Sequence, residues 1–292
     1  MREGIIVKAL SGFYYVRTAE GLLECKARGR FRLDGTSPLV GDRVRCSVDS
    51  AGRGRIDTVE ERKNFFIRPA VANIDALVFV AANVNPVTDP FLIDRVSVIA
   101  EEADCELILC VNKTDLDPGT ELESLYRAAG YPVILTSADT GRGVEELRDA
   151  IRGRVCAFTG NSGVGKSSLL NRLSPGLGLK TAEVSEKLGR GKHTTRHVEL
   201  FDLGEETYLA DTPGYASFEL EMMKIIPKEE LAADFREFRP YLNDCRFQDC
   251  AHRKEPGCAV TEALREGKIA ASRYRSYERL YELSAQHKSW ED

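Results

Sequence analysis

The chain has 292 residues, of which 42% are hydrophobic and 30% are charged, and its formal net charge is −5. This length suffices for two or three domains that each bury a core. No uninterrupted apolar run approaches the roughly 20 residues that a membrane-spanning helix needs, and no N-terminal export signal is evident. We therefore expect a cytoplasmic protein with no membrane partner.

The start of the chain is its basic part. Residues 1–64 hold 13 Lys and Arg against 9 Asp and Glu, a balance of +4, which leaves −9 for the remainder. A local positive balance is what nucleic acid attracts, while an ordinary solvated face is an equal alternative on charge alone.

Short runs of strand-forming residues, separated by turn signals, fill the same region. The expected strands span 5–10, 13–18, 22–33, 43–48 and 55–61. Five strands in about sixty residues predict a small closed barrel of the oligonucleotide-binding (OB) type. The first predicted domain is therefore an OB-like RNA-binding barrel over residues 1–64, with a purely structural barrel as the alternative.

One predicted strand of this barrel carries alternating basic residues, Lys26, Arg28, Arg30 and Arg32. Because successive side chains on a strand point to opposite faces, these four would project from one face. Phe31, Tyr14 and Tyr15 would be available to stack on bases. This face is the predicted RNA-binding surface.

After a predicted linker at 64–73, strands alternate with helices. We expect strands at 74–83, 105–112 and 132–136 and helices at 90–103, 120–129 and 144–152. This alternation predicts a doubly wound parallel sheet with helices on both faces. Two further strands, at 197–203 and 207–210, complete a predicted α/β domain over residues 65–214.

A glycine-rich turn between an apolar strand and a helix start marks the centre of this domain. Its glycines would let backbone N–H groups converge on phosphate oxygens, aided by the helix dipole. Lys166 would reach the β- and γ-phosphates and Ser167 would bind Mg²⁺, whereas an ordinary glycine turn is the alternative. The residues of this turn and helix start that are expected to bind the nucleotide are Gly160, Asn161, Ser162, Gly163, Val164, Gly165, Lys166, Ser167 and Ser168.

The sequence Asn112-Lys113-Thr114-Asp115 ends a predicted strand, in the zone where open α/β sheets bind ligands. Asp115 could accept hydrogen bonds from the guanine N1–H and N2 amine, which adenine does not offer, so this motif predicts selection of GTP. Ser137 and Ala138 end the next strand, where a backbone contact to guanine O6 is required. A polar loop is the alternative.

The sequence Asp211-Thr212-Pro213-Gly214 also ends a strand. Its carboxylate could hold Mg²⁺ through water while the Gly214 N–H meets the γ-phosphate. Thr194 and Thr195 lie in the polar stretch before it, and one of them could complete the magnesium shell. A segment that orders with GTP and relaxes on hydrolysis would act as a switch.

Residues 215–292 form the third predicted domain, which is mainly helical. Its potential metal ligands are Cys245, Cys250, His252 and Cys258. Three thiolates and one imidazole make a closed set suited to one structural Zn²⁺, with unligated thiols as the alternative. The other five cysteines lie in apolar runs and are predicted to be buried. An amphipathic helix is expected at 271–285, and its aromatic stripe is interpreted as packing.

Together these motifs resemble those of TRAFAC-type GTPases, although the base-reading motifs precede the phosphate loop, which is a circular permutation. With a barrel in front and a Cys/His-bearing tail behind, the chain resembles the ribosome-small-subunit-dependent GTPase A family (RsgA/YjeQ). The resemblance implies a GTP-hydrolysing factor that acts late in 30S subunit maturation and binds 16S rRNA. It also implies stimulation by the 30S subunit, release on hydrolysis, structural zinc and Mg²⁺ with GTP, and we expect a monomer.

The resemblance also concerns the hydrolysis step. Ras-like enzymes orient the attacking water with a glutamine after Asp-x-x-Gly, where this chain has Tyr215. In the family a switch histidine is assigned that role, and the matching residue is His193, with an ordinary solvated histidine as the alternative. His193, Lys166 and Thr195 are the expected catalytic residues. Arg196 replaces the family's third switch threonine, and an RNA-binding scaffold or an ATP-dependent enzyme remains an alternative function.

Overall fold

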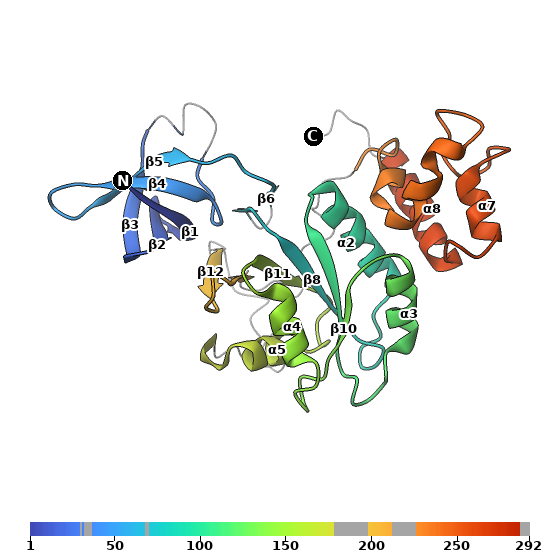
Figure 1. Cartoon of the computed structure of the whole chain (residues 1–292), viewed down its shortest axis with the longest axis horizontal. Helices are drawn as coiled ribbons and strands as arrows, with labels where there is room; N and C mark the ends of the chain where they lie inside the picture. Colours follow the sequence, from blue (N-terminus) through green and yellow to red (C-terminus); the bar gives the residue numbers. More distant parts are fainter. Residues whose placement is uncertain (30, 32–36, 68–69, 178–197, 212–225, 287–292) are drawn as a thin grey trace.

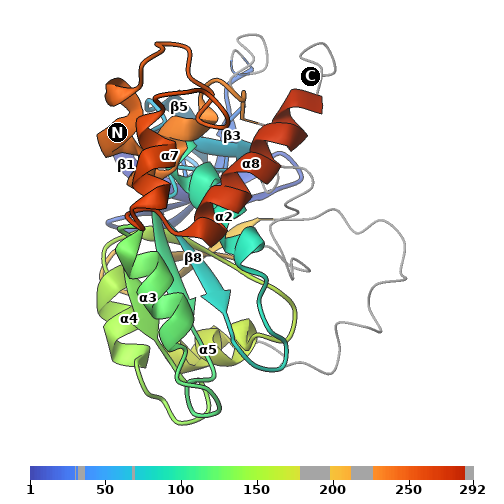
Figure 2. The ribbon, with the colours of Figure 1, turned by 90° about the vertical axis from the view of Figure 1, so that its right-hand side faces the viewer.

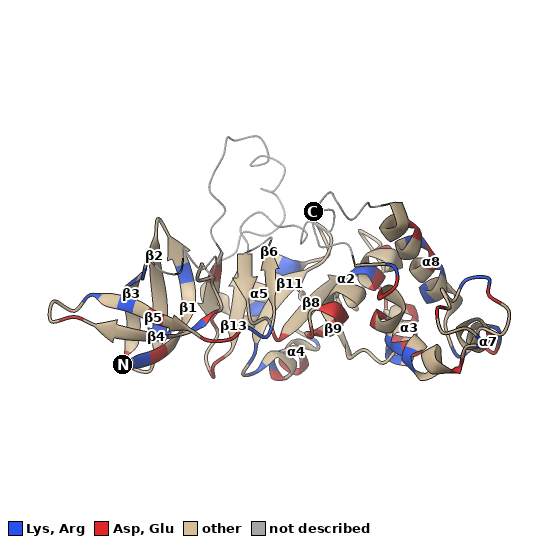
Figure 3. Ribbon diagram, turned by 90° about the horizontal axis from the view of Figure 1, so that it is seen from above, with Lys and Arg blue, Asp and Glu red and all other residues tan. Residues whose placement is uncertain are grey.

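The computed structural model describes residues 1–29, 31, 37–67, 70–177, 198–211 and 226–286, and for Asp211 only the backbone. Three parts follow one another in space (Figures 1 and 3): a β-barrel, a central sheet with helices, and a helical tail. This arrangement confirms the predicted multidomain architecture. No helix among the described residues is long and apolar enough to cross a membrane.

The barrel is built from the first five strands. They are β1 (Arg2–Leu10), β2 (Phe13–Thr18), β3 (Gly21–Ala27), β4 (Arg43–Val48) and β5 (Gly54–Val59). β1 pairs with both β2 and β4, and β5 joins β3 to β4, so the sheet closes on itself. Ile6, Val16 and Ile56 are fully buried inside it. The predicted closed barrel is confirmed.

The basic strand of the barrel is shorter than predicted. β3 ends at Ala27, so of the four basic residues only Lys26 belongs to it. Arg28 follows the strand and its guanidinium pairs with Asp57 at 2.6 Å, while Arg30 and Arg32 lie outside the described residues. The prediction of four alternating side chains on one strand is therefore wrong.

Phe31 is not available for stacking either. A turn in which the Phe31 N–H donates to the Arg28 carbonyl at 3.2 Å directs the chain back, and the phenyl ring is only 6% exposed. Burying a large apolar ring is favourable, so the core takes the aromatic residue that the pattern assigned to the surface. Tyr14 and Tyr15 are half-buried and pack against the same core.

The predicted linker contains a small hairpin, formed by β6 (Phe65–Ile67) and β7 (Ala70–Ala72). The central sheet follows, with β8 (Ala76–Ala81), β9 (Glu106–Val111), β10 (Val133–Leu135), β11 (Val155–Thr159), β12 (Glu199–Asp202) and β13 (Tyr208–Asp211). Its order is β10-β9-β8-β11-β13-β12, and every pair is parallel except β12 with β13.

Helices cover both faces of this sheet. They are α2 (Pro90–Glu102) and α3 (Thr120–Ala128) on one face and α4 (Val144–Ile151) and α5 (Lys166–Leu173) on the other, with a short 3-10 turn, η1 (Pro175–Leu177), after α5. All six residues of β8 are buried, and they alternate: Leu77 and Phe79 face the α2 side, while Val78 faces α4 and α5. The predicted doubly wound sheet is confirmed.

The barrel and the central sheet form one continuous structure. β12 pairs antiparallel with β1, with Lys8 opposite Glu199, so the two parts share an eleven-stranded sheet. One hydrophobic cluster runs through both, from Ile6 in the barrel to Leu200 and Leu77 in the sheet.

The tail has its own core. Its elements are η3 (Leu231–Asp234), η4 (Arg236–Asp244), α7 (Ala259–Arg265) and α8 (Ala271–Gln286). Phe235, Phe238, Tyr274 and Tyr277 pack against one another inside it, so the interpretation of the aromatic stripe as packing is confirmed. α8 lies against α2, the one described helix of the central domain with which α8 makes extensive contact (Figure 2).

Candidate functional site

The glycine-rich loop lies between β11 and α5, and its glycines are sterically required. Gly160 has φ +128°, and a Cβ there would meet the Val80 carbonyl oxygen at 2.1 Å. Gly165 has φ +96°, and its Cβ would meet Asn112 Nδ2 at 2.4 Å. Any other residue would strain the backbone and clash with the neighbouring strands. The loop is thus held tightly against the ends of β8 and β9.

The lysine of the loop points back over it. Lys166 Nζ donates to the carbonyl of Gly160 and, at 2.6 Å, to that of Asn161. Burial lowers the pKa of Lys166 to about 8, because an ammonium group loses hydration there. A bound polyphosphate would raise that pKa again, because a nearby negative charge favours the ammonium form. The electrostatics of the loop therefore favour an anionic ligand.

Asn112 joins the loop to the base-reading segments. Its side chain is buried; Nδ2 donates to the Val164 carbonyl at 2.8 Å. Oδ1 accepts from the Ala138 N–H at 3.0 Å and from Thr136 Oγ1 at 3.2 Å. One side chain thus ties together the phosphate loop and the ends of β9 and β10.

Asp115 is oriented by its neighbours. Ser137 Oγ donates to Asp115 Oδ1 at 2.5 Å and itself accepts from the Thr140 N–H at 3.1 Å. Thr114 Oγ1 donates to the Thr136 carbonyl at 2.9 Å, which fixes the same segment to β10. Asp115 is exposed, so its carboxylate can accept further hydrogen bonds from a ligand. Lys113, with φ +64°, donates to the Asn85 carbonyl beside it.

These groups gather at the carboxyl ends of parallel strands, the usual ligand site of open α/β sheets. The residues expected to bind the nucleotide and described here are Asn112 to Asp115, Ser137, Ala138 and Gly160 to Ser168, and they lie together there. The expected switch residues His193, Thr194, Thr195 and Gly214 lie outside the described residues. The backbone of Asp211 ends β13, which pairs in parallel with β11, the strand that leads into the phosphate loop.

Two residues that touch this site were not expected from the sequence. The Asn85 carbonyl receives Lys113, and the Arg172 guanidinium, from the last turn of α5, donates to the carbonyls of Ala138 and Asp139. Neither belongs to a motif, and no spacing signal in the sequence indicates them, because both contacts depend on segments that are distant in the chain.

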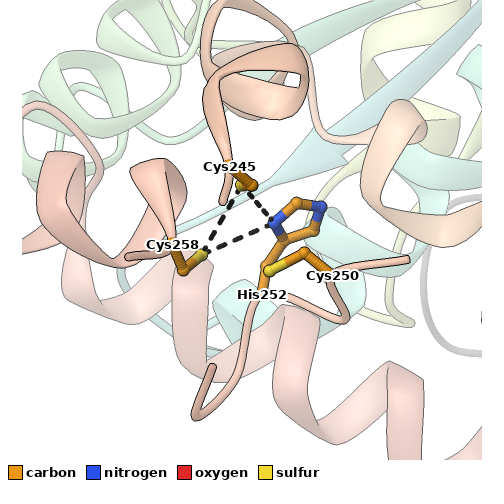
Figure 4. Close-up of side chains that lie close together, drawn as sticks. All are labelled: Cys245, Cys250, His252 and Cys258. Atoms are coloured by element: carbon orange, nitrogen blue, oxygen red, sulfur yellow. Dashed lines mark hydrogen bonds between the residues drawn. The ribbon is translucent and has the colours of Figure 1, made fainter. Parts of the chain in front are cut away.

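The four tail ligands meet in one place (Figure 4). Their ligand atoms all lie within 4.8 Å of one another. His252 Nδ1 is 3.4 Å from Cys245 Sγ and 3.6 Å from Cys258 Sγ, and these two sulfur atoms are 4.0 Å apart. Tetrahedral zinc bonds of about 2.3 Å to sulfur and 2.0 Å to nitrogen place ligand atoms about 3.5 to 3.8 Å apart. The cluster therefore fits a tetrahedral metal ion.

The surrounding side chains hold the ligand loop. Tyr274 Oη donates to the His252 carbonyl and Tyr277 Oη to the Ala251 carbonyl, each at 2.7 Å. The Glu255 carboxylate accepts from the N–H groups of Ala251, Arg253 and Lys254 at 2.9 to 3.3 Å. Burial lowers the pKa of His252, which favours the neutral imidazole that binds metals. The aromatic stripe of α8 thus also supports the metal loop.

The chain is similar to proteins of one family over almost its whole length. The family model described as "RsgA GTPase" matches residues 59–221, and "RsgA N-terminal domain" matches residues 3–56. A curated relative from Caldanaerobacter subterraneus subsp. tengcongensis, "Small ribosomal subunit biogenesis GTPase RsgA", is 46% identical over 94% of this chain and 93% of its own. A relative of the same name from Alkaliphilus metalliredigens is 43% identical over 95% of this chain and 96% of its own.

Two solved structures have the same fold. YjeQ from Thermotoga maritima superposes with a TM-score of 0.85 at 38% identity, covering 98% of this chain and 99% of that one. YloQ, described as a circularly permuted GTPase, gives a TM-score of 0.81 at 35% identity, with 98% and 96% covered. The permuted order of motifs in this chain, with the base-reading loops before the phosphate loop, agrees with that description.

Proposed function

The chain belongs to the RsgA GTPase family, and from this premise we propose that it is a GTP-hydrolysing factor that acts late in the maturation of the small ribosomal subunit. It is a GTP hydrolase, and its relatives carry the name of small-subunit biogenesis GTPases. The observation that supports guanine nucleotide binding best is the Asn112 side chain, which joins the phosphate loop to the loop after β10 beside an exposed Asp115.

Each group at this site has a proposed role. Asp115 accepts from the guanine N1–H and N2 amine, and the segment of Ser137 and Ala138 supplies a backbone contact to O6. Lys166 contacts the β- and γ-phosphates, and Gly214 meets the γ-phosphate. Ser167, Asp211 and one or both of Thr194 and Thr195 offer the oxygen ligands that Mg²⁺ prefers, and the ion would neutralise charge on the β- and γ-oxygens.

Hydrolysis is proposed to be slow in the isolated protein. Tyr215 stands where Ras-like enzymes have their water-orienting glutamine, so we assign that role to His193, assisted by Thr195 and Lys166. Binding to the 30S subunit would complete the site and stimulate turnover, and hydrolysis would release the protein as the switch residues relax.

The other two parts have binding roles in this proposal. The barrel, residues 1–64, contacts 16S rRNA through residues that include Lys26, whose ammonium lies 4.8 Å from the centre of the Phe13 ring. The central domain comprises 65–214. The tail, 215–292, holds one structural Zn²⁺ with four protein ligands, which leaves no open position for catalysis by that ion. The protein is proposed to work as a monomer.

GTP turnover measured with and without purified 30S subunits tests the proposal, with 50S subunits as the control particle. We expect 30S subunits alone to accelerate phosphate release and the protein to dissociate after GTP hydrolysis but to stay bound with a non-hydrolysable analogue. Equal turnover under all conditions would contradict stimulation. Equal dissociation with GTP and with the analogue would favour the scaffold in which the nucleotide is only a structural ligand.

A further inference from the structure

Arg172 lies at the far end of the helix that begins with the phosphate loop. Its Nε donates to the Ala138 carbonyl at 2.9 Å and its Nη2 donates to the Asp139 carbonyl at 2.6 Å. The residue is exposed at the surface, but its planar guanidinium engages two consecutive carbonyls. An arginine can hold both at once because its N–H groups form a rigid fork.

These two carbonyls belong to the loop that follows β10. A trans peptide group is planar, with its N–H on the edge opposite its carbonyl. Holding the Ala138 carbonyl therefore also fixes the direction of the Asp139 N–H, on the side away from Arg172. The peptide group before Ala138 carries the Ala138 N–H, which donates to Asn112 Oδ1 at 3.0 Å. The two peptide groups that flank Ala138 are thus fixed by two different side chains.

Both side chains connect this loop to the phosphate loop. Asn112 reaches the Val164 carbonyl directly, and Arg172 is carried by α5, which continues from Lys166. The spacing between the base-reading loop and the phosphate loop is therefore set at two points. A nucleotide that spans both loops must match this spacing.

We propose that Arg172 is a positioning residue for guanine recognition: by holding the Ala138 carbonyl it fixes the peptide group between Ala138 and Asp139 so that the Asp139 N–H meets the oxygen at purine C6. The inference rests on the proposed guanine nucleotide site. Arg172 acts through the peptide group that it holds, so we expect its effect on ligands that carry that oxygen.

Three nucleotides separate this role from a general one. GDP and inosine diphosphate both carry the C6 oxygen, whereas 2-aminopurine riboside diphosphate lacks it. Because a hydrogen bond from a charged donor contributes modestly at an exposed site, Arg172→Ala should weaken GDP and inosine diphosphate binding equally, by roughly five- to tenfold. The affinity of the Arg172→Ala variant for the 2-aminopurine nucleotide should equal that of the unaltered protein. Arg172→Lys, which offers a point charge in place of a fork, should fall between.

Arg127→Ala is the matched control. Arg127 is also exposed, and its Nη2 donates to the Val133 carbonyl at 2.7 Å, at the opposite end of β10. It should leave all three affinities unchanged. An equal loss for all three nucleotides in Arg172→Ala, or no loss for any, would overturn the inference. If the unaltered protein bound none of them, the proposed nucleotide site itself would fail instead.

Discussion

The central domain joins its two neighbours by very different interfaces. Towards the barrel, β12 pairs with β1 and a single hydrophobic cluster crosses the boundary. Backbone pairing and apolar contact are tolerant of small changes, since apolar burial has no direction and is roughly proportional to area. The barrel interface therefore behaves as part of one core.

Towards the tail, Val98 of α2 joins the hydrophobic cluster of the tail, and the contacts also include buried, directional charged groups. Arg273 on α8 is fully buried and donates to Asp94 Oδ1 at 2.7 Å and to Glu237 Oε1 at 2.6 Å. Arg236 and Arg239 both pair with Glu101, whose side chain is 6% exposed. Asp94 and Glu101 belong to α2, so one helix of the central domain carries the charged contacts described here.

The difference shows two ways to position a domain. An apolar interface loses stability in proportion to the area removed, whereas a buried ionic network depends on each of its members. Removing one partner leaves the other buried and uncompensated. We expect the tail to separate from the central domain in response to single changes that the barrel interface tolerates.

Loss of the zinc proposed for the tail should have the largest effect. Structural zinc contributes on the order of 10 kcal/mol to small metal-binding domains, which exceeds what a short helical tail gains from its core. A zinc-selective chelator, or Cys250→Ala, should make the tail sensitive to trypsin while the barrel and central domain resist cleavage. Elemental analysis should find one zinc per chain before treatment.

Cys105→Ala is the control for that experiment, because Cys105 is buried outside the metal cluster. It should retain zinc and trypsin resistance in the tail. A chelated protein whose tail stays resistant would show that the aromatic core holds the tail alone. The contrast between the barrel interface and the tail interface would then depend only on the contacts that α2 makes with the tail.

Removal of the buried guanidinium should have the next largest effect. Arg273→Ala leaves Asp94 and Glu237 buried without their cation, which should cost about 3–5 kcal/mol in tail stability, measured by urea unfolding of the intact chain. Arg275→Ala, an exposed arginine on the same helix, should change little. The triple variant with Arg273→Met, Asp94→Asn and Glu237→Gln leaves no buried charge at this position. It should recover most of the stability that Arg273→Ala loses. If it does not, the loss comes from packing and the ionic account is wrong.

Truncation at the barrel interface should cost somewhat less. Leu200 on β12 is 4% exposed and belongs to the shared core, so Leu200→Ala should lower the free energy of unfolding by about 2–4 kcal/mol. The barrel and the central domain should still unfold in one transition, and the tail should be unaffected. Leu22→Ala on β3, where the leucine is 55% exposed, is the matched control. Separate unfolding of the barrel would contradict a shared core.

Local patterns predicted most of the elements that this comparison depends on. β2 and β4 begin and end where the strand-forming runs and turn signals placed them, and the apolar run at β8 predicted a strand of the central sheet. The phosphate loop and the Cys/His cluster were visible because each chemistry needs fixed residue types within a short segment. Local periodicity is sufficient where an element is defined by its own neighbours in the chain.

The interfaces could not be predicted in the same way. Lys8 on β1 and its partner Glu199 on β12 are 191 residues apart in the chain, and nothing local to either strand selects that partner. Arg273 in an amphipathic, charge-rich helix is typical of a solvated face, and its burial depends on partners in other elements: Asp94, Ser97 and Glu237. Arg172 is likewise defined by carbonyls that another loop presents. Such contacts are set by tertiary structure, which single-sequence patterns do not contain.

The smallest expected effect is that of the ion pair at the barrel interface. Lys8 Nζ lies 2.7 Å from Glu199 Oε2, with the two side chains 34% and 37% exposed. Water and salt screen a pair that is this exposed, so a double-mutant cycle with Lys8→Ala and Glu199→Ala should give a coupling of at most about 0.5–1 kcal/mol. The coupling should shrink further at high salt. A salt-insensitive coupling as large as that of Arg273 would mean that charge, and not the shared apolar core, positions the barrel, and the contrast between the two interfaces would disappear.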